Sequence, residues 1–583
     1  MRRPYTTLMS LVLMTSTLLV GQLPSILPVK ERTLSNGMRV LIVERNDEPT
    51  ISVGWIARVG SVNEKPGITG LAHLFEHMMF KGSKTIGTKD IKKDLELNDL
   101  QDKLRAKIRE EESYLRARQI RGDIADMSDP KNRSEKHQEM LVEFEKLVKA
   151  QQELIIKDEF SKVYAEAGGT GLNAFTSNDV TCYIQTIPSN KLELWAWMES
   201  DRLYNPVFRE FYKERDVVFE ERRLRTESTP TGKFAELFES MVWEAHPYHW
   251  PVIGWASDLD SITREQALDF FKTYYAPNNL TAVLVGNVNA ADAIPMLEKY
   301  FGRIPRNPNG VPEVVTLEPK QIAEKRMIAD AETTPSVEIA WKAVSTGHKD
   351  IYALDLLSSV LNGRSGRLYK TIVLDKKIAT NVRAEGDNRK YGGVFTISGT
   401  VSGDYKPEDV EQAIYLEIEK IKSNGITGQE LEKVKNQIQA DSFRRQENNF
   451  FLMIQLAQAD AITGYKEFLD SPSKYQKVTL KEIQQVAEKY LTKENRNVAI
   501  YNRKASSKPE DPELAAFPDQ MRAMIKSQLN SIAKIVDVPQ LKTMLGQMEA
   551  QAAQLPPQMK GAFDYLKKKL EAQIDVLSKK EKK

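Results

Sequence analysis

The chain has 583 residues, of which 28% are charged, and this length favours several domains over a single core. The net charge of only +2 excludes a general electrostatic attraction to nucleic acid, so we expect no nucleic-acid partner. The single cysteine, Cys182, excludes an intrachain disulfide and a cysteine-based zinc site, and we expect it to be buried as a small apolar side chain.

Residues 1–25 predict a signal peptide, because two arginines precede a short apolar stretch that small and polar residues follow. A short uncleaved anchor is the alternative, in which case the N-terminal segment would tether the protein. No other segment approaches the ~18 apolar residues of a membrane span. We therefore expect an exported protein without a stable span in its mature part, and a bacterial periplasm suits a chain without disulfides.

The predicted first domain covers residues 30–315. Its first elements are two strand-like runs, "MRVLIVER" and "TISVGWIARVG", which a turn separates and which therefore predict a β-hairpin. The segment "GITGLAHLFEHMMFKGS" follows, and its apolar spacing predicts a helix that Gly82 ends as a C-cap.

Residues 91–160 predict a helical hairpin that interrupts this domain, in the form of an antiparallel coiled coil. Two charged segments with helically spaced apolar residues flank the polar turn "RGDIADMSDPKNRS". Such a hairpin is either a solvated spacer that packs on itself or an arm that docks a partner.

Strands and helices alternate again after the hairpin. A strand region, "GGTGLNAFTSNDVTCYIQTIP", precedes two helices, "NKLELWAWMESDRLYNP" and "EFYKERDVVFEERRLRTES", and a buried strand follows at 278–288. Residues 320–505 repeat a similar order of elements as a second domain, and residues 506–583 form a helical tail that ends in lysines. This repeat favours an internal duplication. In its register, the residues opposite His73, Glu76 and His77 cannot bind a metal; they are Leu354, Leu357 and Ser358.

The stretch "HLFEH" contains two of the six histidines in the chain. On a helix, His73 and His77 project from one face four residues apart, so that both imidazoles can reach one ion. Glu76 lies beside them, where a carboxylate can act as general base on water at the open position of the metal. Two imidazoles favour zinc, with one ion per chain.

A hydrolytic zinc site normally needs a third protein ligand. The remaining histidines are poor candidates, and the helix "ERDVVFEERRLR" offers three carboxylates instead. A spacing of seven puts Glu214 and Glu221 on one helix face, whereas Glu220 points elsewhere. The residues alone do not choose between a ligand and a solvated face.

These segments together resemble the pitrilysin family of inverzincin zinc metallopeptidases, which includes insulin-degrading enzyme and the mitochondrial processing peptidase. The resemblance rests on "HLFEH", "LNAFTSNDVTCY", "ESDRLYNPVF" and "ERDVVFEERR" and covers residues 32–505 except the hairpin. It implies an α+β fold with two homologous α/β sandwich domains. The family spacing between the histidine pair and the glutamate ligand is about half that found here, and the hairpin accounts for the excess.

The resemblance also implies roles for individual residues. It makes Glu221 the third zinc ligand and Glu214 a supporting catalytic carboxylate, with Glu76 as the base. It further implies that an edge strand at Asn173, Ala174 and Phe175 binds the backbone of a peptide substrate by β-augmentation.

One departure from the family concerns an arginine and a tyrosine, seven residues apart, that grip the substrate in many active members. Val373 and Thr380 occupy these positions. The family's two-chain enzymes can borrow the pair from a metal-free sister subunit, so we expect a homodimer or such a heterodimer. Arg364 or Arg367 could substitute locally, although an ordinary loop-stabilising role is the simpler interpretation.

Three functions are consistent with these residues and motifs. The first is an exported zinc endopeptidase that hydrolyses short or unfolded peptides, as the catalytic subunit of a two-chain enzyme. The second is a vestigial assembly protein that docks partners through its hairpin. The third is a zinc hydrolase with a non-peptide substrate, against which the strand at Asn173–Phe175 argues.

Overall fold

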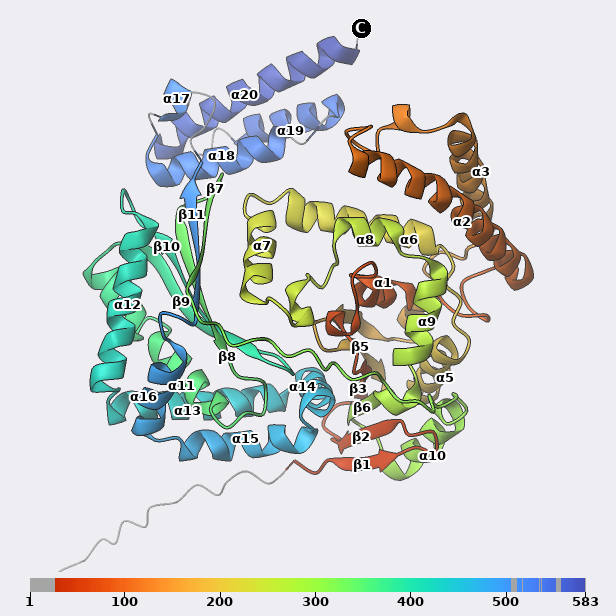
Figure 1. Ribbon diagram of the computed structural model, residues 1–583, viewed down its shortest axis with the longest axis horizontal. Helices are drawn as coiled ribbons and strands as arrows, with labels where there is room; N and C mark the ends of the chain where they lie inside the picture. Colours follow the sequence, from red (N-terminus) through yellow and green to blue (C-terminus); the bar gives the residue numbers. More distant parts are fainter. Residues whose placement is uncertain are drawn as a thin grey trace, which may run out of the picture. The chain divides into compact units, whose positions relative to one another are not determined.

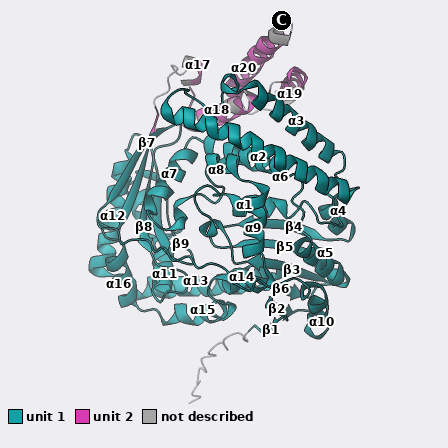
Figure 2. Ribbon diagram, turned by 45° about the vertical axis from the view of Figure 1, so that its right-hand side comes forward, with its two compact units in different colours: residues 1–502 teal, residues 503–583 magenta. Residues whose placement is uncertain are grey.

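Two β-sheets and the helices around them make up most of the chain (Figure 1). The computed structural model describes residues 27–504, 511–515, 517–533, 535, 537–551 and 557–581. Residues 1–502 form one unit and residues 503–583 a second (Figure 2). The predicted signal peptide lies outside the described residues.

The first sheet has six strands in the order β1-β2-β6-β3-β5-β4. The strands are β1 (Lys30–Thr33), β2 (Arg39–Glu44), β3 (Thr50–Ala57), β4 (Thr170–Thr176), β5 (Thr181–Pro188) and β6 (Leu280–Gly286). The predicted hairpin of β2 and β3 is wrong, because β6 lies between them, parallel to β2 and antiparallel to β3. Every residue of β6 is buried, and its two neighbours satisfy the hydrogen-bonding groups of both its edges.

Helices cover one face of this sheet and form the main core of the first domain. This core includes Trp55 on β3, Phe75 on α1 (Leu71–Met78) and Trp195 on α5 (Leu192–Tyr204). Further side chains come from α6 (Phe211–Arg222), α9 (Arg264–Tyr274) and α10 (Ala290–Phe301). The helix that carries the histidine pair is therefore packed on a rigid sheet.

The opposite face of the first sheet is covered by a helix from the predicted second domain. Leu452, Met453 and Leu456 on α14 (Asn449–Ile462) pack against the strands in a separate apolar cluster. Cys182 is buried there, as expected. Arg39 and Arg58 also reach across to Asp460 on α14, at 2.7 and 2.8 Å. The two predicted domains thus share one packed interface.

The predicted helical hairpin is present as α2 (Ile91–Arg121) and α3 (Glu135–Gln152), which lie side by side (Figure 2). A third helix, α4 (Glu159–Glu166), leads back to β4. The hairpin is anchored at its base, where the buried carboxylate of Asp94 is 2.8 Å from Arg209. Its inner side includes polar pairs, since Gln151 donates to Asp94 and to Asn98.

The second sheet has five strands in the order β7-β11-β8-β10-β9. The strands are β7 (Lys325–Ala331), β8 (Ser336–Ala343), β9 (Ala379–Asn388), β10 (Gly393–Val401) and β11 (Arg496–Arg503). Its helices are α11 (Ile351–Leu361), α12 (Pro407–Asn424), α13 (Gly428–Glu447), α15 (Tyr465–Lys477) and α16 (Leu480–Tyr490). Leu354 and Leu357, which the proposed duplication matches to the metal motif, lie in this core on α11.

The second unit, at the C-terminal end of the chain, is helical as predicted. It consists of α17 (Pro512–Ala515), α18 (Asp519–Ala533), α19 (Val538–Gln551) and α20 (Pro557–Glu581). These helices share their own apolar cluster, which includes Ile525, Leu541, Leu566 and Leu570.

Candidate metal centre

Side chains at both ends of helix α1 fix its position, and with it the position of the histidine pair. At its start, the buried carboxylate of Glu64 accepts hydrogen bonds from the backbone N–H groups of Gly70 (2.8 Å) and Ala72 (2.7 Å). These are amides that an isolated helix leaves without partners. At its end, the guanidinium of Arg202 donates to the carbonyl of Met79 at 3.2 Å.

The predicted end of this helix at Gly82 is wrong, because α1 ends at Met78. The Arg202 side chain satisfies the terminal carbonyl, so no glycine cap is needed there. Gly82 instead occupies a left-handed conformation (φ 86°) in the turn that follows, close to the carbonyl of Ile86.

Three donor groups converge where the sequence predicted the metal. Nε2 of His73 is 3.8 Å and Nε2 of His77 is 3.5 Å from Oε2 of Glu221 on α6. One ligand atom from each residue lies within 4.8 Å of the other two, and no other such group occurs in the described part of the chain. Two imidazole nitrogens and a carboxylate oxygen are a donor set that zinc prefers, so these residues fit a zinc ion.

The imidazole of His73 is suited to metal binding because it is neutral. Burial, together with the positive charges of His77 and Arg225, lowers the pKa of His73 to about 3. A metal ligand must offer an unprotonated nitrogen, and at neutral pH this side chain does so without losing a proton first.

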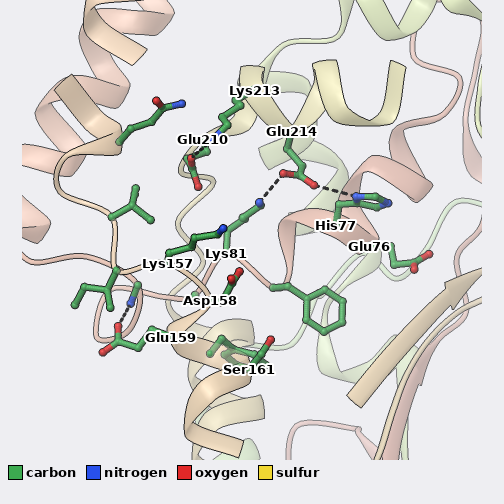
Figure 3. A pocket seen from close by; sticks show the side chains of 17 residues that line it. Glu76, His77, Lys81, Lys157, Asp158, Glu159, Ser161, Glu210, Lys213 and Glu214 are labelled. Atoms are coloured by element: carbon green, nitrogen blue, oxygen red, sulfur yellow. Dashed lines mark hydrogen bonds and ion pairs between the residues drawn. The ribbon is translucent and has the colours of Figure 1, made fainter. Parts of the chain in front are cut away.

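Glu214 supports His77 from behind (Figure 3). Its Oε1 is 2.9 Å from Nδ1 of His77, and its Oε2 is 2.5 Å from Nζ of Lys81. Burial acts to raise the pKa of Glu214, but the hydrogen bonds from His77 and Lys81 outweigh it and the pKa is lowered. The carboxylate therefore stays ionised and keeps the proton of His77 on Nδ1, which leaves Nε2 free to face Glu221.

The carboxylates on α6 point in two directions, as the helical spacing predicted. Glu214 and Glu221 face α1, whereas Glu220 is 58% exposed and pairs with Arg223. Oε1 of Glu221 also contacts Arg225 at 2.8 Å, so a cation neutralises the oxygen that faces away from the histidines.

Glu76 is connected to the neighbouring edge strand. The hydroxyl of Thr176, the last residue of β4, donates to Oε2 of Glu76 at 2.5 Å. Burial raises the pKa of Glu76, while the bond from Thr176 and the charge of His77 oppose that shift. The edge strand and the candidate base are therefore fixed relative to each other.

Asn173, Ala174 and Phe175 lie on β4, at one edge of the first sheet. They pair with β5 on one side only, and a bulge precedes them between Thr170 and Asn173. The backbone N–H of Ala174 is turned away from β5 and donates to Oδ1 of Asn173 at 2.9 Å. An extended peptide could form backbone hydrogen bonds with this edge.

The positions of the missing arginine and tyrosine lie in the second domain. Val373 is part of the helical turn Tyr369–Asp375, and Thr380 is on β9. Arg367 pairs with Glu430 at 2.7 Å, in keeping with a loop-stabilising role.

Five residues that support the site were not predicted: Glu64, Lys81, Thr176, Arg202 and Arg225. Lys81 follows His77 by one helical turn, and Thr176 follows the predicted substrate strand directly. The sequence positions of Lys81 and Thr176 could therefore have indicated that both residues lie near the site. Arg202 lies in the family motif "ESDRLYNPVF", but nothing in the spacing of that motif indicates that its guanidinium reaches Met79.

Comparisons with known proteins agree with this architecture. The family model described as "Insulinase (Peptidase family M16)" matches residues 39–124, and the one described as "Peptidase M16 inactive domain" matches residues 261–438. The zinc protease PqqE of Helicobacter pylori is 29% identical over 427 residues, which are 72% of this chain and 80% of that protein. Both matching models are of the M16 peptidase family, and this chain is thus similar to pitrilysin-like M16 proteins.

More distant M16 members show the same relationship. A probable mitochondrial-processing peptidase subunit beta of Arabidopsis thaliana is 22% identical over 70% of this chain and 66% of that protein. Among solved structures, a protease from Helicobacter pylori has a TM-score of 0.67 at 24% identity, and the match covers 82% of this chain and all of that one. The periplasmic protease PqqL from Escherichia coli has a TM-score of 0.61 at 16% identity, over 84% of this chain and 50% of that one. The two-domain M16 fold is thus established.

The sequence predicted no membrane span after the N-terminal segment. None of the helices in the described part of the chain is long and apolar enough to cross a membrane.

Proposed function

We propose that this chain is an active zinc endopeptidase that hydrolyses short or unfolded peptides. The observation that carries the proposal is the convergence of His73, His77 and Glu221 beside Glu76, which an open sheet edge adjoins. Catalytic machinery and a binding edge for peptide backbone are thus directly connected through Thr176.

The residues divide the chemistry between them. The three ligands would hold one zinc ion, which supplies a Lewis acid that polarises the scissile carbonyl and lowers the pKa of water. Oε2 of Glu76 accepts the Thr176 hydroxyl, which leaves Oε1 to take a proton from the attacking water and to return it to the leaving amine. Glu214 keeps His77 in the tautomer and orientation that a ligand needs.

The substrate class follows from β4. An extended peptide that adds to this edge places its backbone next to Glu76, and only a chain without stable structure can offer such a strand. The edge therefore favours a peptidase over a zinc hydrolase with a non-peptide substrate.

A vestigial assembly role is the second candidate, and the replacement of the arginine and tyrosine by Val373 and Thr380 is the observation in its favour. The intact ligand set, base and supporting carboxylate argue against it. We propose instead that a metal-free sister subunit supplies the missing pair, in a heterodimer that uses this chain as its catalytic subunit. The N-terminal sequence supports export to a periplasm as the place of action.

The test is hydrolysis of a quenched, unstructured peptide by the purified zinc-loaded chain. Glu76→Gln should abolish cleavage while one zinc per chain remains bound, and Glu220→Gln on the exposed face of α6 should change neither property. A folded, zinc-loaded chain that is inactive alone but gains activity with a sister subunit supports the two-chain form. If neither condition gives Glu76-dependent cleavage, the peptidase proposal is wrong.

A further inference from the structure

A second cavity lies behind the helix that supplies Glu221. It is an open pocket with a volume of about 850 Å³, and it is lined by the hairpin helices α2 and α3 and by α6 and α8 (Ala256–Ser261). Figure 2 shows α2 and α3 next to α6 and α8. This volume is typical of cavities that bind small organic ligands.

The cavity is separate from the metal centre, although both use α6. Phe219 lines the cavity, and it lies five residues after Glu214 and two before Glu221. At about 100° per residue, Phe219 points roughly 140° away from Glu214 and 160° away from Glu221 around the helix axis. The metal ligand and the cavity wall therefore occupy opposite faces of one helix.

Apolar side chains form much of the cavity wall. Leu115 on α2 and Leu141 on α3 contribute from the hairpin, Met127 from its turn and Phe219 from α6. Leu115 is only 4% exposed, so it forms part of the deep wall. These groups can pack against an apolar ligand but cannot bind a charge.

Buried nitrogen atoms without partners lie among these apolar groups. His137 is 2% exposed, and neither of its ring nitrogens has a hydrogen-bond partner; Nε of Arg105, which is 6% exposed, also lacks one. The other two nitrogens of Arg105 are held by Glu112, at 2.9 and 3.2 Å. Burial lowers the pKa of His137, so its ring is neutral and retains one donor. Unpaired buried donors beside a cavity are groups that a ligand oxygen can satisfy.

The charges around the cavity leave an excess of positive charge. Among the described residues, Arg116 has no ion pair, and the guanidinium of Arg133 donates only to the carbonyl of Ser128. The two carboxylates are already engaged, since Glu112 pairs with Arg105 and Asp260 lies near Arg215. Two guanidinium groups are therefore available to an anion.

We propose that this cavity binds an apolar molecule that ends in a carboxylate, with the carboxylate at Arg116 and Arg133 and the apolar body against Leu115, Leu141 and Phe219. A medium-chain fatty acid and the C-terminal end of a peptide with apolar last residues share this chemistry. The hairpin at 91–160 then serves as one wall of a ligand site.

The proposal can be tested by calorimetric titration of the zinc-loaded full chain. Octanoate is compared with 1-octanol, and N-acetyl-Leu-Phe with its C-terminal amide, so that each carboxylate has a neutral partner of the same apolar body. We expect at least one carboxylate to bind tenfold or more tightly than its partner, and the tighter of the two identifies the source. Absence of carboxylate binding, or equal binding of a carboxylate and its neutral partner, would overturn the proposal.

Variants locate the site. The double variant Arg116→Gln/Arg133→Gln should weaken carboxylate binding about tenfold or more, because it removes both cations. Arg118→Gln, on the same helix but outside the cavity, should leave binding unchanged. Leu141→Trp should block the cavity without changing its charge, and circular dichroism verifies that each variant is folded. Unchanged affinity in both the double variant and Leu141→Trp would place binding elsewhere and refute the proposal.

Discussion

Glu214→Gln tests whether a carboxylate behind His77 determines how well the site holds zinc. The substitution keeps the shape of the side chain and an oxygen that can accept from Nδ1 of His77, but it removes the negative charge. It also deprives Lys81 of the carboxylate that lies 2.5 Å from its ammonium group. The imidazole becomes a weaker donor to the metal and is held less firmly.

The magnitude follows from the hydrogen bonds that change. A hydrogen bond to a charged group contributes roughly 1.5–3 kcal/mol, and a neutral one about 1 kcal/mol. The difference corresponds to a loss of about 0.5–2 kcal/mol in zinc binding, and therefore to a zinc Kd that rises about 2- to 30-fold. Competition with a chromophoric chelator measures this Kd without any need for catalysis.

Glu220→Gln is the matched control for Glu214→Gln, because it removes the same charge from the exposed face of α6. Its zinc Kd should stay within twofold of that of the unmodified chain. A Glu214→Gln variant with unchanged zinc affinity, or a Glu220→Gln variant with an equal loss, would show that the contact at 2.9 Å does not support the metal.

Three further predictions concern the binding edge and the stability of the chain. Ala174→Pro removes the N–H that points away from β5, so KM for an unstructured peptide should rise at least tenfold while zinc affinity is kept; an unchanged KM would exclude the edge from binding. Asp460→Ala leaves Arg39 and Arg58 without their buried carboxylate and should lower the free energy of unfolding by about 3–5 kcal/mol in urea titrations; a loss below 1 kcal/mol would contradict the proposed importance of that contact. Burial raises the pKa of Asp355 to about 6 from 3.8, so the folded state retains this proton as pH rises, and stability should fall by up to about 3 kcal/mol between pH 4 and 6.5. Asp355→Asn should lack this component, and identical pH profiles would refute it.

The residues that come together at the metal centre could be predicted where their relationship is local. His73 and His77 are one helical turn apart, and Glu214 and Glu221 are two turns apart, so the helix alone fixes which side chains share a face. The assignment of Glu221 as the ligand opposite the histidines needed the family resemblance, because no local rule indicates which helices pack against each other.

The order of strands could not be predicted in the same way. The sequence "RVLIVERNDEPTISVGWIA" has the pattern of a hairpin, and only the arrival of β6 from more than 200 residues later separates its strands. A two-strand pattern specifies which residues are buried, but not which strand lies beside which. The contact of Arg202 with Met79 is equally non-local, so the local sequence does not indicate that α1 ends before Gly82.

The packing of α14 on the first sheet has a consequence for how the chain is made. Leu41, Val283 and the other apolar residues of that face stay uncovered until residues 449–462 have been synthesised. A nascent chain or a fragment limited to residues 30–315 therefore exposes an apolar sheet face that favours aggregation, although it already contains every candidate zinc ligand. The candidate metal centre therefore lacks its complete scaffold in such a fragment, and this scaffold is complete only when almost the whole first unit has emerged.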